Sequence, residues 1–196
     1  MGSIFKSFSP KTDVSSNTAV KSSVQRGMRT KLLEQYPDTL GADDGVLLEA
    51  IWPKKESIQL VKFSREHVSI IVLKGTPLFF QHHDGPYLPT LHLLQKYPQL
   101  LPAITVDRGA IRFLLSGATI MAPGLTSAGG VLPPTEKAIS KGTPVGVFAQ
   151  GKESPLTVGL LKMDTEEIRK TGKGQAVENV HYLGDDLWKT CATEGL

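Results

Sequence analysis

Asp107 is the first candidate for chemistry, because it stands beside Arg108 and Gly109, where a carboxylate can act as a general base or nucleophile. No second acid, activated nucleophile or oxyanion arrangement completes a mechanism by motif. Ser116 and Ser127 also lack a surrounding G-x-S-x-G pattern. A carboxylate between a strand and a helix commonly accepts backbone N–H groups. The sequence therefore predicts a structural Asp107, no catalytic residue and no enzymatic activity.

The histidines and the cysteine do not form a metal-binding pattern. His82 and His83 are adjacent, which in a strand directs their rings to opposite faces, and the other histidines are dispersed. Cys191 is the single cysteine, so there is no internal disulfide and no Cys/His pair with zinc spacing. The segment 172–174 lacks the rest of a P-loop. We predict no metal, no cofactor and an intracellular, cytoplasmic protein.

The glycine-rich stretch 106–127 must position Asp107. It predicts the end of a strand at 105–107, a helix from Gly109 to Gly117, and a strand over 118–122. A turn is expected at Pro123-Gly124. Small residues at the helix start leave N–H groups free to receive phosphate. Three apolar residues of the stretch are expected in the core: Phe113, Leu114 and Ile120.

The same region carries no charged residue between Arg112 and Glu136. A membrane span of ~20 residues would have to be continuous helix, but several prolines and glycines interrupt this segment. We predict no membrane association.

The positive charge is concentrated at the N-terminus. The chain has 22 Lys and Arg against 19 Asp and Glu, a net charge of +3, but in residues 1–31 six cations face Asp13 alone. A local surplus of cations favours a polyanion such as rRNA, and a solvated helix face is the alternative. The rRNA-contact candidates are Lys21, Arg26 and Arg29.

Periodicity divides the chain into two parts. A helix from Ala19 buries a stripe of four residues, and three short strands over 58–63, 68–73 and 77–81 follow. A helix over 90–96 leads to a boundary near residues 101–103. Further strands are expected over 145–150, 156–163 and 176–182. The helix stripe consists of Val20, Val24, Met28 and Leu32.

Several short motifs point to a known family. D-x-G-A, L-S-G-A and I-M-A-P-G occur here in the order and spacing of the PUA domain, an RNA-binding module. Residues 87–98 (Y-x-P-T-L-x-L-L-x-K-Y-P), V-D-R-G-A-I-R-F, P-G-L-T-S and H-Y-L-G-D-D-L-W resemble the malignant-T-cell-amplified-sequence family of translation machinery-associated proteins. The resemblance covers nearly the whole chain. Ala122 departs from it, because the family is expected to place cysteine before Pro-Gly.

This resemblance implies an α+β fold: an N-terminal α/β domain with a small antiparallel sheet (1–101), followed by a PUA-type partly open β-barrel (102–196). PUA domains hold RNA along the groove between the first helix and the neighbouring strand. The residues at the matching positions are Arg108, Gly109, Ala110, Arg112, Ser116, Gly117, Met121, Pro123 and Gly124.

The implied function is that of a non-enzymatic translation factor. Family members bind the small ribosomal subunit and the acceptor end of tRNA, pair with density-regulated protein, and act in release of deacylated tRNA during recycling and in reinitiation. The expected partner-binding residues are Phe79, Phe80, Tyr87 and Pro89. Two alternatives stay open: an accessory subunit of an RNA-modification enzyme and an RNA-binding protein of ribosome assembly.

Overall fold

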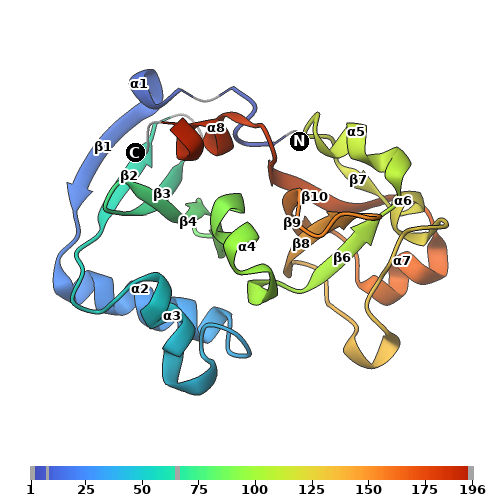
Figure 1. Ribbon diagram of the computed structural model, residues 1–196, viewed down its shortest axis with the longest axis horizontal. Helices are drawn as coiled ribbons and strands as arrows, with labels where there is room; N and C mark the ends of the chain where they lie inside the picture. The colour runs from blue at the N-terminus through green and yellow to red at the C-terminus, as the bar shows by residue number, and fades with distance from the viewer. Residues whose placement is uncertain (1–2, 8, 65–66, 194–196) are drawn as a thin grey trace. The chain divides into compact units, whose positions relative to one another are not determined.

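The computed structural model describes residues 3–7, 9–64 and 67–193 (Figure 1). These residues belong to two compact units. The N-terminal unit contains Ser9–Thr90 and the residues from Thr190 onward, and the C-terminal unit contains Leu91–Lys189 and the first residues of the chain. The predicted boundary at residues 101 and 102 stays a prediction.

The N-terminal unit is built on an antiparallel sheet in which neighbouring strands follow the order of the chain, β1-β2-β3-β4-β5. The strands expected over 58–63, 68–73 and 77–81 are confirmed as β2, β3 and β4. β5 was not expected, because it is very short and contains a proline. The bounds are β1 Val14–Ala19, β2 Gln59–Phe63, β3 Val68–Leu73, β4 Thr76–His82 and β5 Tyr87–Pro89.

Helix α2 is the long helix of this unit, and of the predicted stripe only Leu32 is fully buried. Its buried residues are Gln25, Arg29 and Leu32, whereas Val24 is 50% exposed. The buried positions follow the i, i+4, i+7 spacing of one helix face. Gln25 and Arg29 take the place of the expected Val24 and Met28, and Leu32 is common to both sets. The helical segments are α1 Pro10–Asp13, α2 Ser22–Gln35, the 3-10 turn η1 Ala42–Gly45 and α3 Val46–Ile51.

The C-terminal unit contains a curled sheet in the order β6-β8-β9-β10-β7. The β6–β8 pair is parallel and the other pairs are antiparallel. Together with the N-terminal sheet and the helices, it confirms the expected α+β fold with a partly open barrel. The strands are β6 Ala103–Val106, β7 Ile120–Met121, β8 Pro144–Ala149, β9 Thr157–Leu161 and β10 Gln175–Tyr182.

The helices of this unit are short. The helix expected over 90–96 is confirmed as α4, and Pro123-Gly124 opens helix α6 instead of forming the expected turn, because proline suits the first helical position. The helical segments are α4 Leu91–Lys96, η2 Pro98–Leu100, η3 Arg108–Ala110, α5 Ile111–Leu114, α6 Pro123–Thr126, η4 Thr135–Lys137, α7 Thr165–Thr171 and α8 Asp186–Thr193, whose last residues belong to the N-terminal unit.

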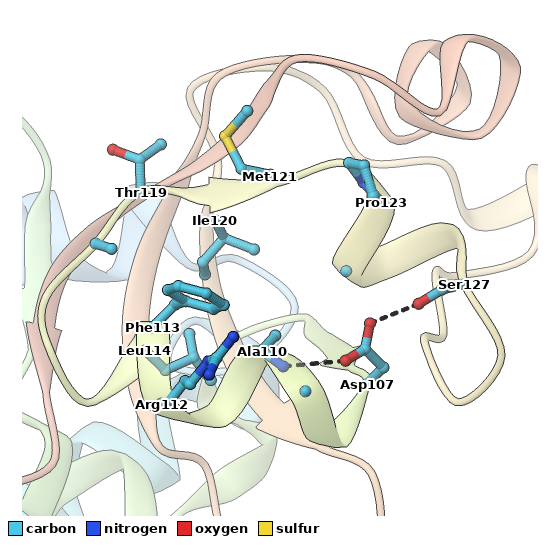
Figure 2. A pocket seen from close by; sticks show the side chains of 13 residues that line it. Asp107, Ala110, Arg112, Phe113, Leu114, Thr119, Ile120, Met121, Pro123 and Ser127 are labelled. Carbon is cyan, nitrogen blue, oxygen red and sulfur yellow. Dashed lines mark hydrogen bonds between the residues drawn. The ribbon is translucent and has the colours of Figure 1, made fainter.

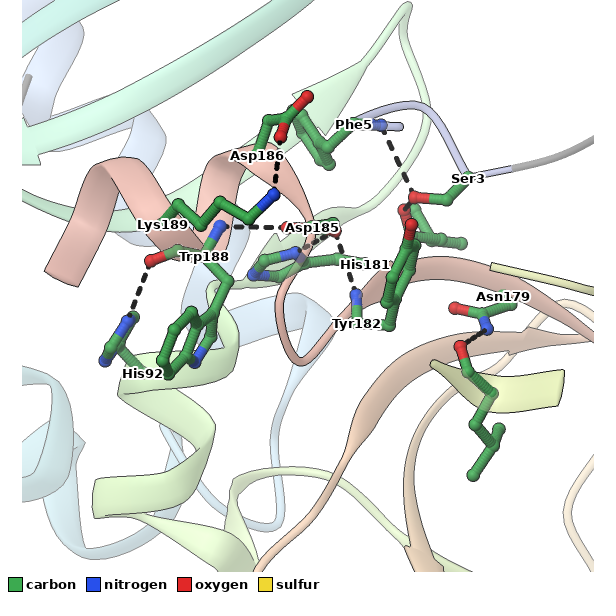
Figure 3. A network of polar contacts seen from close by, with 12 residues as sticks. Ser3, Phe5, His92, Asn179, His181, Tyr182, Asp185, Asp186, Trp188 and Lys189 are labelled. Atoms are coloured by element: carbon green, nitrogen blue, oxygen red, sulfur yellow. Dashed lines mark hydrogen bonds and ion pairs between the residues drawn. The ribbon is translucent and has the colours of Figure 1, made fainter. Parts of the chain in front are cut away.

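A buried polar network holds the end of β10 and the chain start in this unit (Figure 3). The Asp185 carboxylate accepts the backbone N–H of Tyr182 at 2.9 Å and that of Trp188 at 2.8 Å, and it lies 2.7 Å from His181 Nδ1. Ser3 Oγ donates to the Val180 carbonyl at 2.9 Å. Because each bond joins a buried polar group to a partner, the network fixes the strand without an unpaired carboxylate.

The same strand anchors helix α5. Asn179 of β10 is buried, and its Nδ2 donates to the Leu114 carbonyl at 3.0 Å (Figure 3). Leu114 and Ile120 lie in the apolar core with Val106 and Leu125, as expected for the first two. The core and this bond therefore set the position of α5 relative to β7.

Candidate nucleic-acid interface

A pocket of about 630 Å³ opens between η3, α5, β7 and α6 (Figure 2). Phe113 and Met121 lie in its lining and are 51% and 47% exposed. Phe113 was expected in the core, which is wrong: α5 is a single turn, and Leu114 alone of its residues is buried. The pocket thus presents an aromatic ring and a thioether to solvent, a surface on which a flat base can stack.

Arg112 supplies the positive charge of the pocket. Its guanidinium carbon lies 4.7 Å from the centre of the Phe113 ring, within the range of a cation–π contact. The Arg112 side chain is exposed and makes no ion pair within the described part of the chain. It is therefore available to a phosphate or to a base edge beside the ring.

Asp107 occupies the opposite side of the pocket and has the structural role that the sequence predicts. Its Oδ1 accepts the backbone N–H of Ala110 at 3.0 Å, and its Oδ2 accepts Ser127 Oγ–H at 2.5 Å (Figure 2). The Ser127 bond, assisted by the N–H groups of Ala110 and Gly109 and opposed by partial burial, lowers the pKa of the Asp107 carboxyl. The carboxylate is therefore ionised at neutral pH.

This cap corrects the expectation of free donors at the helix start. The Ala110 N–H is already bonded to Asp107, so it is not available to a phosphate. The backbone N–H of Asp107 itself donates to the Gly124 carbonyl at 2.9 Å, which ties η3 to α6. The glycine-rich motifs thus form the walls of the pocket, and the Ala110 N–H is not among the donors that a ligand can use.

The comparisons with known proteins cover both halves of the chain. Residues 8–98 match the family model described as a Pre-PUA-like domain, and residues 101–186 match the model described as elF2D, PUA domain. Translation machinery-associated protein 20 of Schizosaccharomyces pombe is 45% identical over 187 residues, which cover 95% of this chain and 98% of that protein. Malignant T-cell-amplified sequence 1 of Danio rerio is 45% identical over 185 residues, covering 94% and 97%. The chain belongs to the malignant-T-cell-amplified-sequence family of translation machinery-associated proteins.

Solved structures agree with the assignment of a PUA domain. A PUA domain protein from Aeropyrum pernix K1, determined as a tartrate complex, matches with a TM-score of 0.67 and 25% identity over 90% of this chain and 91% of that one. A hypothetical protein from Pyrococcus horikoshii matches with a TM-score of 0.69 and 20% identity over 90% and 99%. The second likeness shows the fold alone.

Six of the nine predicted RNA-binding positions in the PUA domain line the pocket, while Arg108, Ser116 and Gly117 do not. Ser116 Oγ donates to the Phe113 carbonyl at 2.9 Å, and Gly117 ends the helix with φ of +75°. A Cβ at Gly117 would meet the Tyr182 ring at 2.8 Å, so glycine is required there for packing. The six in the lining are Gly109, Ala110, Arg112, Met121, Pro123 and Gly124.

The three cations predicted to contact rRNA differ in their surroundings. Lys21 and Arg26 are exposed, whereas Arg29 is 8% exposed. Arg29 Nη2 lies 2.8 Å from Glu49 Oε2, Nη1 donates to the Trp52 carbonyl, and the guanidinium lies over the Trp52 ring. Its donors are engaged inside the N-terminal unit, so Arg29 presents little of its charge to an rRNA phosphate.

The N-terminal unit also contains a basic groove of about 420 Å³ beside α2. Arg26 lines it together with Lys54 and Lys55, which are exposed and were not singled out from the sequence. The sequence feature that could have indicated them is the adjacent pair of lysines after Pro53. The fold brings this pair next to the N-terminal cations, which strengthens the local positive charge.

The four residues expected to bind a partner lie inside the N-terminal unit. Phe79 and Phe80 are 0% exposed, and Tyr87 and Pro89 are buried as well. The carbonyl of Tyr87 accepts Gln35 Nε2–H at 2.7 Å and the Tyr36 hydroxyl at 2.5 Å. Partner binding through these residues stays a prediction, and their side chains offer it little exposed surface.

The described residues contain no group of three or more His, Cys, Asp or Glu that could hold a metal ion. The rings of His82 and His83 do not point to opposite faces as expected, because β4 ends at His82 and His83 turns with φ of +51°; the ring centres are 4.4 Å apart. Within residues 3–7, 9–64 and 67–193, no helix combines the length and apolar character needed to cross a membrane.

Proposed function

We propose that the protein is a cytoplasmic, non-enzymatic translation factor that binds the small ribosomal subunit and takes the acceptor end of tRNA into the PUA pocket. The observation that carries the proposal is the pocket itself, in which an exposed aromatic ring, a thioether and a guanidinium surround a space of about 630 Å³. A cavity of this size suits a small ligand. An unstacked nucleotide at an RNA end fits this description, whereas a paired base is not accessible.

The family indicates in which cellular process this pocket would bind RNA. One relative is named a translation machinery-associated protein, and we propose the same association here. Release of deacylated tRNA during recycling and reinitiation would follow from binding the acceptor end on the small subunit. A density-regulated-protein-like partner, bound as a heterodimer, completes the proposal. The family assignment favours translation over the accessory-subunit alternative, because one relative that covers nearly the whole chain is named for the translation machinery.

The stacking surface can be tested by replacing Phe113 with alanine. Loss of one base–aromatic contact costs about 1–3 kcal/mol, so affinity for an acceptor-end RNA should fall roughly 5- to 150-fold. Fluorescence anisotropy with a labelled tRNA minihelix gives the affinity. Leu115→Ala is the matched control, because Leu115 is also exposed on this segment but lies outside the pocket lining. Equal weakening by both variants would contradict a specific stacking role for Phe113.

The N-terminal cations are tested by salt dependence. Replacing Lys21 and Arg26 with glutamine should weaken binding to the small subunit and flatten the plot of log affinity against log salt by roughly one unit for each phosphate that is no longer neutralised. A charge-matched control replaces Lys137 and Lys170 of the C-terminal unit, which are exposed. An unchanged slope in the folded Lys21 and Arg26 variant would mean that both residues lie on a solvated helix face and do not contact rRNA.

A further inference from the structure

One corner of the pocket presents hydrogen-bond acceptors without free donors. Ser127 Oγ–H and the Ala110 N–H, which face Asp107, are both donated to its carboxylate. The Gly109 N–H also favours the ionised carboxylate. What remains toward the pocket is the acceptor capacity of the carboxylate that these donors leave unused, together with the lone pairs of Ser127 Oγ. A ligand group that binds in this corner must therefore bring its own protons.

The charge of the corner excludes a phosphate as its occupant. Asp107 is ionised, because the Ser127 bond lowers its pKa. Arg112 is the cation of the pocket lining, and it lies on the Phe113 side rather than beside Ser127 (Figure 2). A phosphate placed against Asp107 would meet like charge, and the Ala110 N–H and Ser127 Oγ–H are already donated to the carboxylate. Neutral hydroxyl groups would instead form charge-assisted hydrogen bonds.

The two oxygens of a carboxylate match the two hydroxyls of a vicinal diol. An RNA chain exposes a free 2′,3′-diol at its 3′-terminal ribose, since every internal ribose has its 3′-oxygen in a phosphodiester. With a terminal base on Phe113 and Met121, the ribose would lie toward Asp107 on the other wall of the pocket (Figure 2). Acidic residues bind ribose hydroxyls in the same way in dinucleotide-binding domains.

We propose that Asp107 accepts hydrogen bonds from the 2′- and 3′-hydroxyls of a terminal ribose, so that the pocket selects RNA with a free 3′ end. This inference rests on the proposed function, because it assumes that the pocket takes the acceptor end of tRNA. It adds a basis for selecting deacylated tRNA: an aminoacyl ester occupies one hydroxyl, removes one donor and adds bulk in the corner.

The test uses the full chain and a 5′-labelled single-stranded RNA ending in C-C-A, prepared with three different ends. One RNA has the free diol, the second has a 3′-phosphate, and the third has a 3′-deoxy terminal nucleotide. Anisotropy should show the 3′-phosphate RNA binding about tenfold or more weakly than the diol RNA, and the 3′-deoxy RNA several-fold more weakly, because charge-assisted hydrogen bonds are lost.

Asp107→Asn should bind the diol RNA more weakly and lose most of the preference against the 3′-phosphate, since the repelling charge is gone. The amide oxygen of the introduced asparagine can still accept the Ala110 N–H, which preserves the cap. Asp164→Asn is the charge-matched control: Asp164 precedes α7, accepts the Lys141 N–H and lies outside the pocket lining. This control should keep the wild-type preference.

Ser127→Ala gives a second variant that retains the carboxylate, and it should keep the preference for the diol. The wild-type protein decides the inference even if Asp107→Asn does not fold. Equal wild-type affinity for all three RNAs would overturn the inference and leave the proposed function standing. Wild-type protein that binds none of them would overturn both.

Discussion

Replacing Ala110 with glutamate is expected to lower the affinity for a tRNA acceptor end by about tenfold or more, which corresponds to about 1.4 kcal/mol or more. Ala110 lines the pocket, and its Cβ would lie 3.5 Å from a Cβ placed on Gly124 of the facing helix. A glutamate side chain at this position would enter the space that the ligand needs. It would also add a second carboxylate beside Asp107, which repels RNA.

The control for this variant is Ala128→Glu, which adds the same charge at an exposed position outside the pocket lining. Affinity for deacylated tRNA on the small subunit and thermal unfolding are measured on the same preparations. Ala110→Glu should unfold near the wild-type temperature and still bind through the N-terminal unit. A folded Ala110→Glu protein with wild-type affinity would remove this pocket from the RNA-binding surface.

The second large effect concerns stability of the N-terminal unit. Arg29→Met should lower its free energy of unfolding by about 1–3 kcal/mol, because hydrogen bonds to a charged donor are lost and the buried Trp52 carbonyl loses a donor. Methionine keeps much of the apolar stem of arginine, so the change reports the guanidinium contacts rather than a large cavity. Urea denaturation followed by tryptophan fluorescence measures the difference.

Arg26→Met is the matched control for Arg29→Met. Arg26 lies less than one turn away on the exposed face of α2, where substitutions usually change stability within about 0.5 kcal/mol. The two variants should also differ in RNA binding, with Arg26→Met flattening the salt dependence and Arg29→Met leaving it unchanged. If Arg29→Met were as stable as wild type and flattened the salt dependence, Arg29 would be an rRNA contact after all.

Much of the fold follows from local sequence patterns. Alternating apolar residues predict β2 to β4, and the ordered D-x-G-A, L-S-G-A and I-M-A-P-G motifs indicate the PUA domain from the sequence alone. The structural role of Asp107 was also predictable, because a carboxylate before a helix has nearby N–H groups to accept. These features depend on residues that are close together in the chain.

The positions that differ from the sequence-based prediction have both distant and local causes. Arg29 is buried because Glu49 and the Trp52 carbonyl accept hydrogen bonds from its guanidinium, and helix periodicity carries no information about either acceptor. Phe113 is exposed because α5 has a single turn, too short for a hydrophobic face to be read. The occupied Ala110 N–H could have been inferred from the Asp107 cap itself, since a capping carboxylate uses the donors that the motif was expected to offer.

The central claim is that the PUA pocket holds the acceptor end of deacylated tRNA. Cryo-electron microscopy of the small ribosomal subunit with this protein and deacylated tRNA tests it most directly. Native complexes, purified by pulling down this protein, would supply the sample together with any bound partner. The account predicts density for the terminal nucleotide between Phe113 and Met121, with its ribose against Asp107. An acceptor end bound elsewhere, with this pocket empty, would contradict the claim.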